Sequence, residues 1–152
     1  AMEEVQKRVL HTFDEFTDII KELRSEHGCP WDREQTHNSL KPCISEETAE
    51  LLAAIRIYDT KGSYENMREE LGDILLQVVM HSQIAKEEGL FSIEDVITEI
   101  SEKMIRRHPH VFGDVQADTA EEVLNNWDDI KKKEKENQQR FIKQWRRGEC
   151  RV

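Results

Sequence analysis

Residues 67–85, MREELGDILLQVVMHSQIA, limit most strongly what this chain can fold into, because they read as one uninterrupted α-helix. Apolar residues recur there at the three- and four-residue spacing of an inward-packing helix face, and they are Leu71, Ile74, Leu75, Val78 and Ala85. The other sides of this stretch are also apolar, at Leu76, Val79 and Met80. A helix that is apolar nearly all round belongs at the centre of a fold, so the rest of the chain is expected to pack around it.

Acidic residues stand near the start of this predicted central helix. Glu70 and Asp73 are three residues apart, so they project about 60° apart, on one flank of the helix. A second predicted helix, over residues 40–58, repeats the pattern with Glu47 and Glu50. Two acidic pairs at the same spacing, each followed by a strongly apolar stretch, call for a role other than core packing.

The composition and the spacing of apolar residues predict an all-α protein. A chain of 152 residues is long enough for one domain with its own core, and 6 Gly and 3 Pro are too few for a turn-rich β protein. Helical spacing recurs in five stretches, which predicts a bundle of about five helices over residues 3–26, 40–58, 67–85, 92–107 and from 119 onward. We expect a single domain over residues 1–152, with its core over about 3–131 and a charged extension over 132–152.

The connections between the predicted helices are short. Residues 29–36, CPWDREQT, are expected to form a loop, because Pro30 disfavours the helical conformation for Cys29. Trp31 in this loop either plugs the core or offers a surface on which a ring can stack. Residues 59–63, DTKGS, join the second helix to the central one so tightly that the two should pack antiparallel as a hairpin.

Charge and cysteine content narrow the partners and the compartment. A net charge of −10 argues against nucleic acid or an anionic membrane surface as the main partner. No apolar run reaches the roughly 18 residues of a membrane span. Cys29, Cys43 and Cys150 are odd in number and lack the spacing of a zinc site, which indicates reduced thiols and a cytoplasmic protein.

The two acidic pairs have two interpretations. Helices joined as a hairpin run in opposite directions, so the pairs meet only if the helices cross or are offset; otherwise they are solvated helix faces. If the four carboxylates converge, bound cations or protonation must relieve their repulsion. Oxygen ligands without His or Cys favour Mg²⁺, with Mn²⁺ as a substitute.

Basic and aromatic residues can complete such a site. Lys103, Arg106 and Arg107 lie in the last turn of a predicted helix, where they either complement the helix dipole or bind phosphate groups. Trp31 or Trp127 can stack against a nucleobase. Together these residues indicate metal-dependent chemistry on a phosphorylated small molecule, without deciding which bond breaks.

Four motifs, CPWDREQTHNSL, EETAE, EELGDILLQVVMH and RRHPHVF, occur in this order, and with them the chain resembles the MazG nucleoside triphosphate pyrophosphohydrolases. These belong to the all-α NTP pyrophosphatase group. The resemblance implies an all-helical, four-helix-bundle-like core and a homodimer, or a higher oligomer, with the central helices packed across the two-fold axis. It implies Mg²⁺ ligands at Glu47, Glu50, Glu70 and Asp73. It also implies nucleotide contacts at Glu46, Glu69, Lys103, Arg107, Trp127 and Lys131.

The reaction expected from the resemblance is hydrolysis of a nucleoside triphosphate to the monophosphate and pyrophosphate, as housekeeping removal of non-standard or excess nucleotides. Water attacks the α-phosphorus, and Glu46 or Glu47 takes its proton. The chain departs from some relatives in carrying one such domain where they carry two, and in having Cys43 where some have a basic residue. Two other interpretations stay open: a narrower hydrolase of dUTP or phosphoribosyl-ATP, and a non-catalytic helical dimerisation module.

Overall fold

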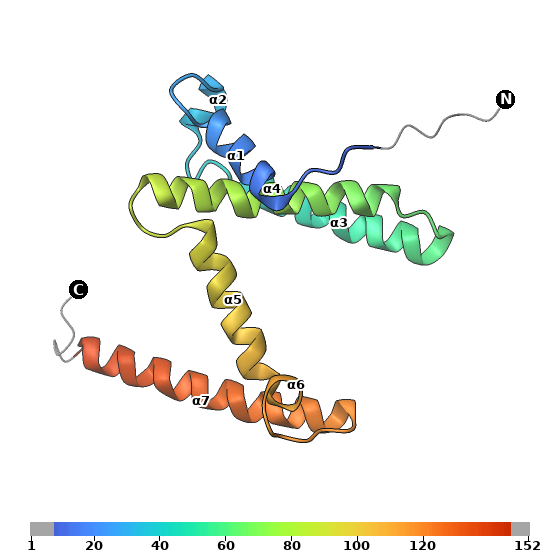
Figure 1. The fold of residues 1–152 in the computed structure, drawn as a ribbon, viewed down its shortest axis with the longest axis vertical. Coiled ribbons are helices and arrows are strands. Elements are labelled where there is room, and N and C mark those ends of the chain that lie inside the picture. Colours follow the sequence, from blue (N-terminus) through green and yellow to red (C-terminus); the bar gives the residue numbers. More distant parts are fainter. Residues whose placement is uncertain (1–7, 147–152) are drawn as a thin grey trace. The chain divides into compact units, whose positions relative to one another are not determined.

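The computed structural model describes the backbone of residues 8–146 and the side chains of residues 8–138. The prediction of an all-α fold is confirmed, since the described residues form helices and no strand. In chain order the helices are α1 (Phe13–Leu23), α2 (Pro30–Glu34), α3 (Lys41–Lys61), α4 (Glu65–Glu87), α5 (Ile93–Arg107), α6 (Pro109–Phe112) and α7 (Ala120–Arg146) (Figure 1). The chain divides into two units, Ala1–Val96 and Ile97–Val152, which are described in turn.

The first helix is shorter than the sequence pattern predicted. It begins at Phe13, because the Thr12 hydroxyl caps it by accepting a hydrogen bond from the Glu15 amide at 3.2 Å. Val5 and Val9 fit the apolar period of the predicted helix over residues 3–26, but Val9 lies before the observed helix and is 81% exposed. Val5 lies outside the described residues. The helix ends in a tight turn in which a Cβ at Gly28 would overlap the carbonyl oxygens of Glu22 and Leu23.

The prediction of a loop over residues 29–36 is wrong. Pro30 occupies the first position of α2, where its missing N–H costs no hydrogen bond, and Cys29 is the extended residue before it. Arg24 holds this segment, since its guanidinium donates to the carbonyl oxygens of Asp32 and Gln35. The same guanidinium binds Glu87 at 2.8 Å, which ties α2 to the end of α4.

Helices α3 and α4 form the predicted antiparallel hairpin and lie side by side (Figure 1). The second helix extends past its expected end at residue 58 to Lys61, so the connection is only Gly62 to Tyr64. Gly62 ends α3 in the left-handed conformation, with φ of 71°, which favours glycine at that position. The hairpin therefore turns within three residues.

The core of the first unit lies where α1, α3 and the C-terminal half of α4 pack. Its buried apolar side chains are Ile20, Leu40, Val79, Met80 and Ile84, with partly buried Phe16, Leu23, Cys43, Leu76 and Ile93 against them. The predicted inward face of α4 is only partly right. Ala85 is buried and Ile74 half-buried, but Leu71, Leu75 and Val78 are exposed in the single chain. The core instead takes the side of α4 that carries Val79 and Met80, because α1 packs there.

The α5 helix begins in the first unit and ends in the second. Ser92 and Asp95 have the three-residue spacing of a capping box, and the Ser92 N–H donates to the Asp95 carboxylate at 2.8 Å. The helix ends at Arg107, and Pro109 then begins the single turn of α6. No helix in the described part of the chain is long and apolar enough to cross a membrane.

The long α7 helix begins at the predicted cap, where the Glu122 amide donates to the Thr119 hydroxyl at 3.3 Å. The charged run after residue 130 continues this helix, and its described side chains are mostly exposed. Phe141, Ile142 and Trp145 were expected either to cover a neighbouring surface or to fray. Their side chains lie outside the described residues.

Candidate metal centre and nucleotide-binding residues

The four carboxylates predicted to bind metal lie together between α3 and α4. One oxygen atom from each of Glu47, Glu50, Glu70 and Asp73 can be chosen so that all four lie within 4.8 Å of one another. The sequence left open whether the two pairs meet, and the hairpin brings them together. The two pairs therefore form one cluster, in which Glu50 is exposed and the other three side chains are half-buried.

The surroundings of the cluster disfavour full ionisation. Burial raises the pKa of Glu70 to about 7, and the negative charge and hydrogen bond of Glu50 add to the effect. Burial, followed by the charges of Asp73 and Glu50, also raises the pKa of Glu47. One carboxylate oxygen each of Glu47 and Glu70 is buried without a hydrogen-bond partner in the described structure. Such oxygens need either a proton or a cation.

The donor set fits a hard divalent cation. All four side chains offer oxygen, which is the ligand that Mg²⁺ and Mn²⁺ prefer. Oxygen atoms around one Mg²⁺ at about 2.1 Å lie at most about 4.2 Å apart. The four carboxylate oxygens lie within 4.8 Å of one another, which is close to this span.

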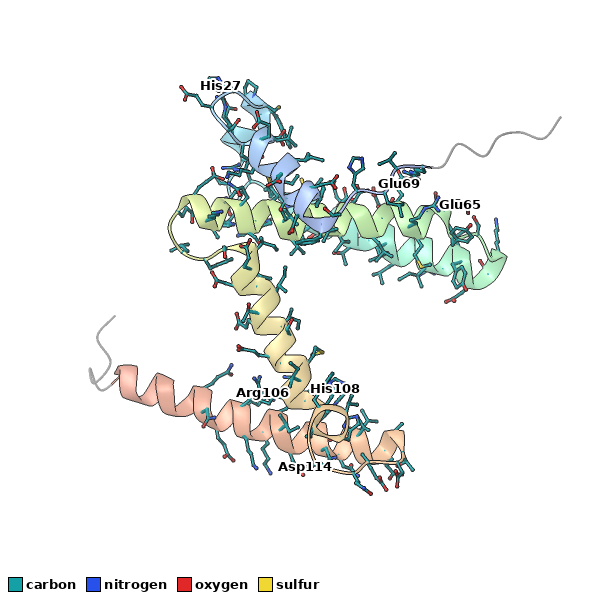
Figure 2. The ribbon with its side chains drawn as sticks, in the orientation of Figure 1. His27, Glu65, Glu69, Arg106, His108 and Asp114 are labelled. Carbon is teal, nitrogen blue, oxygen red and sulfur yellow. The ribbon has the colours of Figure 1, made fainter. Side chains whose placement is uncertain are left out.

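The other residues of the first unit that were predicted to contact the nucleotide lie on α2, α3 and α4. Glu46 and Glu69 are exposed neighbours in sequence of the metal-ligand candidates Glu47 and Glu70, and Figure 2 shows Glu69 on α4. Trp31 on α2 is 60% exposed, so it is not a plug over the core. Its role as a stacking surface stays a prediction.

The predicted phosphate-binding arginines of the second unit are held by a carboxylate that the sequence analysis missed. Arg106 at the end of α5 (Figure 2) donates to one oxygen of Glu134 at 2.9 Å. Arg107 donates to the other oxygen at 2.8 Å. The hydrogen bonds from Arg107, then from Arg106, lower the pKa of Glu134 to about 2. Lys103, Arg106 and Glu134 line a groove of about 700 Å³.

Trp127 on α7 is surrounded by polar residues of the same unit. The His108 ring meets it edge to face, with centroids 5.2 Å apart, and the Lys131 ammonium lies 6.0 Å from its centroid. His108 in turn hydrogen-bonds through Nδ1 to the Met104 carbonyl oxygen at 2.6 Å. Trp127, Lys131 and Glu134 share one face of α7 because they are spaced by four and three residues. That spacing is the signal that could have indicated Glu134.

A family model of the MazG nucleotide pyrophosphohydrolase domain matches residues 35–112. The match is slightly more than half of the chain and includes all four clustered carboxylates as well as Lys103, Arg106 and Arg107. An all-helical protein with this cluster and this match is of the MazG class, and the chain belongs to the MazG nucleotide pyrophosphohydrolase domain family.

Two similar proteins and one solved structure support this membership. The chain is 56% identical over 86% of its length to a Bacillus subtilis protein named uncharacterized protein YabN, and covers 26% of it. It is 54% identical over 81% of its length to the Thermotoga maritima nucleoside triphosphate pyrophosphohydrolase/pyrophosphatase MazG, and covers 45% of that protein. The chain thus spans less than half the length of these relatives.

The solved structure of a mazG-related protein from Thermotoga maritima is similar at a TM-score of 0.63 and 26% sequence identity. The similarity covers 78% of this chain and 98% of that one.

Proposed function

We propose that the protein hydrolyses nucleoside triphosphates to the monophosphate and pyrophosphate, with Mg²⁺ as cofactor and Mn²⁺ as a substitute. The observation that carries this proposal is the convergence of Glu47, Glu50, Glu70 and Asp73 from two helices of the hairpin. The names of the relatives support the reaction, and removal of non-standard or excess nucleotides is the role that we assign to it. The free thiols of Cys29 and Cys43 suit a reducing compartment, so we assign the protein to the cytoplasm.

In this proposal the four carboxylates hold the cation. A divalent ion there supplies charge that neutralises the phosphate oxygens and activates a water molecule. The raised pKa values of Glu47 and Glu70 show that the cluster is unfavourable when fully ionised, and a cation removes that cost. The same residues therefore have a physical reason to bind metal and to bind it more tightly as the pH rises.

The proposed reaction breaks the bond between the α- and β-phosphates. A water oxygen forms the new bond to the α-phosphorus, pyrophosphate leaves with the electron pair, and a carboxylate accepts the water proton. Glu46 and Glu47 are the two candidates for this base. Glu47 is a member of the carboxylate cluster, whereas Glu46 is exposed and is not part of it.

We assign the nucleotide contacts to side chains that carry charge or an aromatic ring. Lys103, Arg106 and Arg107 are proposed to bind phosphate oxygens, which guanidinium groups can do through two parallel hydrogen bonds. Aromatic side chains are proposed to stack on the base. The complete set of proposed contacts is Trp31, Glu46, Glu69, Lys103, Arg106, Arg107, Trp127 and Lys131.

A second copy of the chain is the proposed partner of the exposed apolar side of α4. Leu71, Leu75 and Val78 are 52%, 38% and 42% exposed there, and a groove of about 380 Å³ between α3 and α4 lies on the same side. The groove also contains Gln77 and His81, whose Oε1 and Nε2 atoms are buried without a partner in the described structure. A homodimer would cover the apolar side chains of this surface.

Pyrophosphate release from a panel of canonical, damaged and deoxy nucleotides, with dUTP and phosphoribosyl-ATP included, tests the function. We expect Mg²⁺-dependent release by the wild type and none above background by Glu47→Ala or Asp73→Ala, with the helical circular dichroism retained. Activity confined to dUTP or phosphoribosyl-ATP would replace the broad assignment with the narrower one. Full turnover by either variant would refute the site, and a wild type that neither binds nucleotide nor responds to Mg²⁺ would leave a helical interaction module.

A further inference from the structure

We propose that Glu134 is a positioning residue, which fixes the guanidinium of Arg107 so that its remaining N–H groups are presented to a nucleotide phosphate. This inference rests on the proposed function, in which Arg107 binds phosphate. Glu134 lies on α7 and uses a different oxygen for each arginine, Oε1 for Arg106 and Oε2 for Arg107. One carboxylate thus bridges two consecutive guanidinium groups at the end of α5.

The burial of the three side chains distinguishes the two arginines. The side chains of Arg107 and Glu134 are 18% and 25% exposed, whereas that of Arg106 is 53% exposed. A hydrogen-bonded ion pair that is shielded from water holds its geometry better than an exposed one, because solvent competes less for its donors. Arg107 is therefore the arginine whose orientation Glu134 determines most strongly.

The contact leaves donors of Arg107 available. A guanidinium has five N–H groups, and the hydrogen bond to Glu134 uses Nη2. The Nε atom of Arg107 is buried without a hydrogen-bond partner in the part of the chain that is described, so the donors left for a phosphate are the remaining N–H groups of Nη1 and Nη2. Glu134 thus immobilises Arg107 through one nitrogen without occupying the whole fork that would meet a phosphate.

The position of Glu134 on α7 links it to the other proposed nucleotide contacts. Trp127, Lys131 and Glu134 share one helix face, and Lys131 lies over the Trp127 ring. The same face of α7 therefore carries a candidate base-stacking ring, a cation and the carboxylate that holds Arg107. A side chain held in its binding geometry loses less conformational freedom when ligand arrives, which strengthens binding.

Two other roles for Glu134 make different predictions. If it only joins α5 to α7, its loss lowers the melting temperature, and any effect on nucleotide binding does not depend on Arg107. If it competes with phosphate for the arginines, its loss tightens nucleotide binding. A positioning role weakens nucleotide binding, and this effect disappears when Arg107 is absent.

The test is Glu134→Gln, which keeps the size of the side chain and removes its charge. Glu136→Gln is the matched control, because it makes the same charge change at an exposed position of the same helix. We expect Glu134→Gln to raise KM for the nucleoside triphosphate about tenfold, with kcat within about twofold of the wild type, and Glu136→Gln to match the wild type. In an Arg107→Ala background, Glu134→Gln should change KM no further.

Calorimetry with inorganic triphosphate makes the test independent of turnover. We expect Glu134→Gln to bind this anion about tenfold more weakly than the wild type and Glu136→Gln to bind it equally well. Unchanged or tighter binding by Glu134→Gln, or a loss of the same size with Arg107 absent, would overturn the proposal. A wild type without pyrophosphate release would contradict the proposed function instead, while the anion measurement would still decide the role of Glu134.

Discussion

Magnesium binding by the acidic cluster should release protons, in an amount that the pKa of Glu70 sets. With a pKa of about 7, about half of the metal-free molecules carry a proton on Glu70 at pH 7, about nine in ten at pH 6 and about one in ten at pH 8. A carboxylate must lose its proton to bind a cation. Binding at pH 7 should therefore release about half a proton from Glu70, and the raised pKa of Glu47 adds to this release.

Isothermal titration calorimetry with MgCl₂ measures this release directly. At one pH, the observed binding enthalpy depends linearly on the ionisation enthalpy of the buffer, and the slope is the number of protons released. We expect a slope of at least about half a proton at pH 7 and a much smaller one at pH 8. The apparent affinity should weaken by about tenfold for each pH unit below 7 and change little above pH 8.

The Glu70→Gln variant is the internal control, because it removes this titrating group and keeps the size of the side chain. It should bind Mg²⁺ more weakly and release fewer protons at pH 7 than the wild type. Tight Mg²⁺ binding by the wild type at pH 7 without any dependence of the enthalpy on buffer would refute the argument that burial and neighbouring charges raise the pKa of Glu70. Wild-type affinity in Glu70→Gln would remove Glu70 from the ligand set.

Three further predictions concern the stability of the protein and the exposed side of α4. The folded-state pKa of Glu70 is above its ordinary value of 4.5, so the stability that its proton confers is full below about pH 4.5 and is lost as the pH rises through about 7. The melting temperature of metal-free protein should therefore fall between pH 5.5 and pH 8. The fall should be smaller in Glu70→Gln, because only the raised pKa of Glu47 remains. At pH 8, Mg²⁺ at a hundred times its Kd should raise the free energy of unfolding by about 2.7 kcal/mol and the melting temperature by roughly 5–11 °C. An unchanged melting temperature would argue against a metal site. Light scattering should show that Val78→Asp is a monomer with its helical content retained, whereas the wild type is a dimer. The control Asp114→Asn, in an exposed loop, should remain a dimer. A dimeric Val78→Asp, or a monomeric wild type, would contradict the proposed interface.

The hairpin and the two acidic pairs were predictable because both follow from local spacing, whereas the meeting of the pairs depends on the register of the two helices. Two carboxylates three residues apart lie on one flank of any helix, whatever the helix packs against. Two helices joined by a short connection pack antiparallel. The register between α3 and α4 was not predictable, since it depends on where α3 ends. The helix continues to Lys61 and stops at a left-handed Gly62, which the sequence pattern placed inside a longer loop.

The wrong predictions came from choices that local spacing does not decide. Val9 fits the apolar period of the first helix, but the cap at Thr12 starts the helix after it. Leu75 and Val79 are both apolar positions of α4, and only the packing of α1 decides that Val79 is the buried one. The spacing on α7 shows only which helix face Glu134 shares with Trp127 and Lys131. Glu134 was missed because its partners Arg106 and Arg107 lie 28 and 27 residues away, on another helix.

The position of the core explains how the hairpin can hold four carboxylates together. On α4 the ligand candidates Glu70 and Asp73 lie in the N-terminal half, whereas the fully or nearly buried residues Val79, Met80 and Ile84 lie in the C-terminal half. Burial of each such side chain contributes about 1.5–3 kcal/mol. The apolar half therefore stabilises the hairpin independently of the acidic half, so the carboxylates can be kept close in the absence of metal. The carboxylates therefore repel one another in the metal-free fold. A bound cation would relieve this repulsion, and the relief would strengthen metal binding.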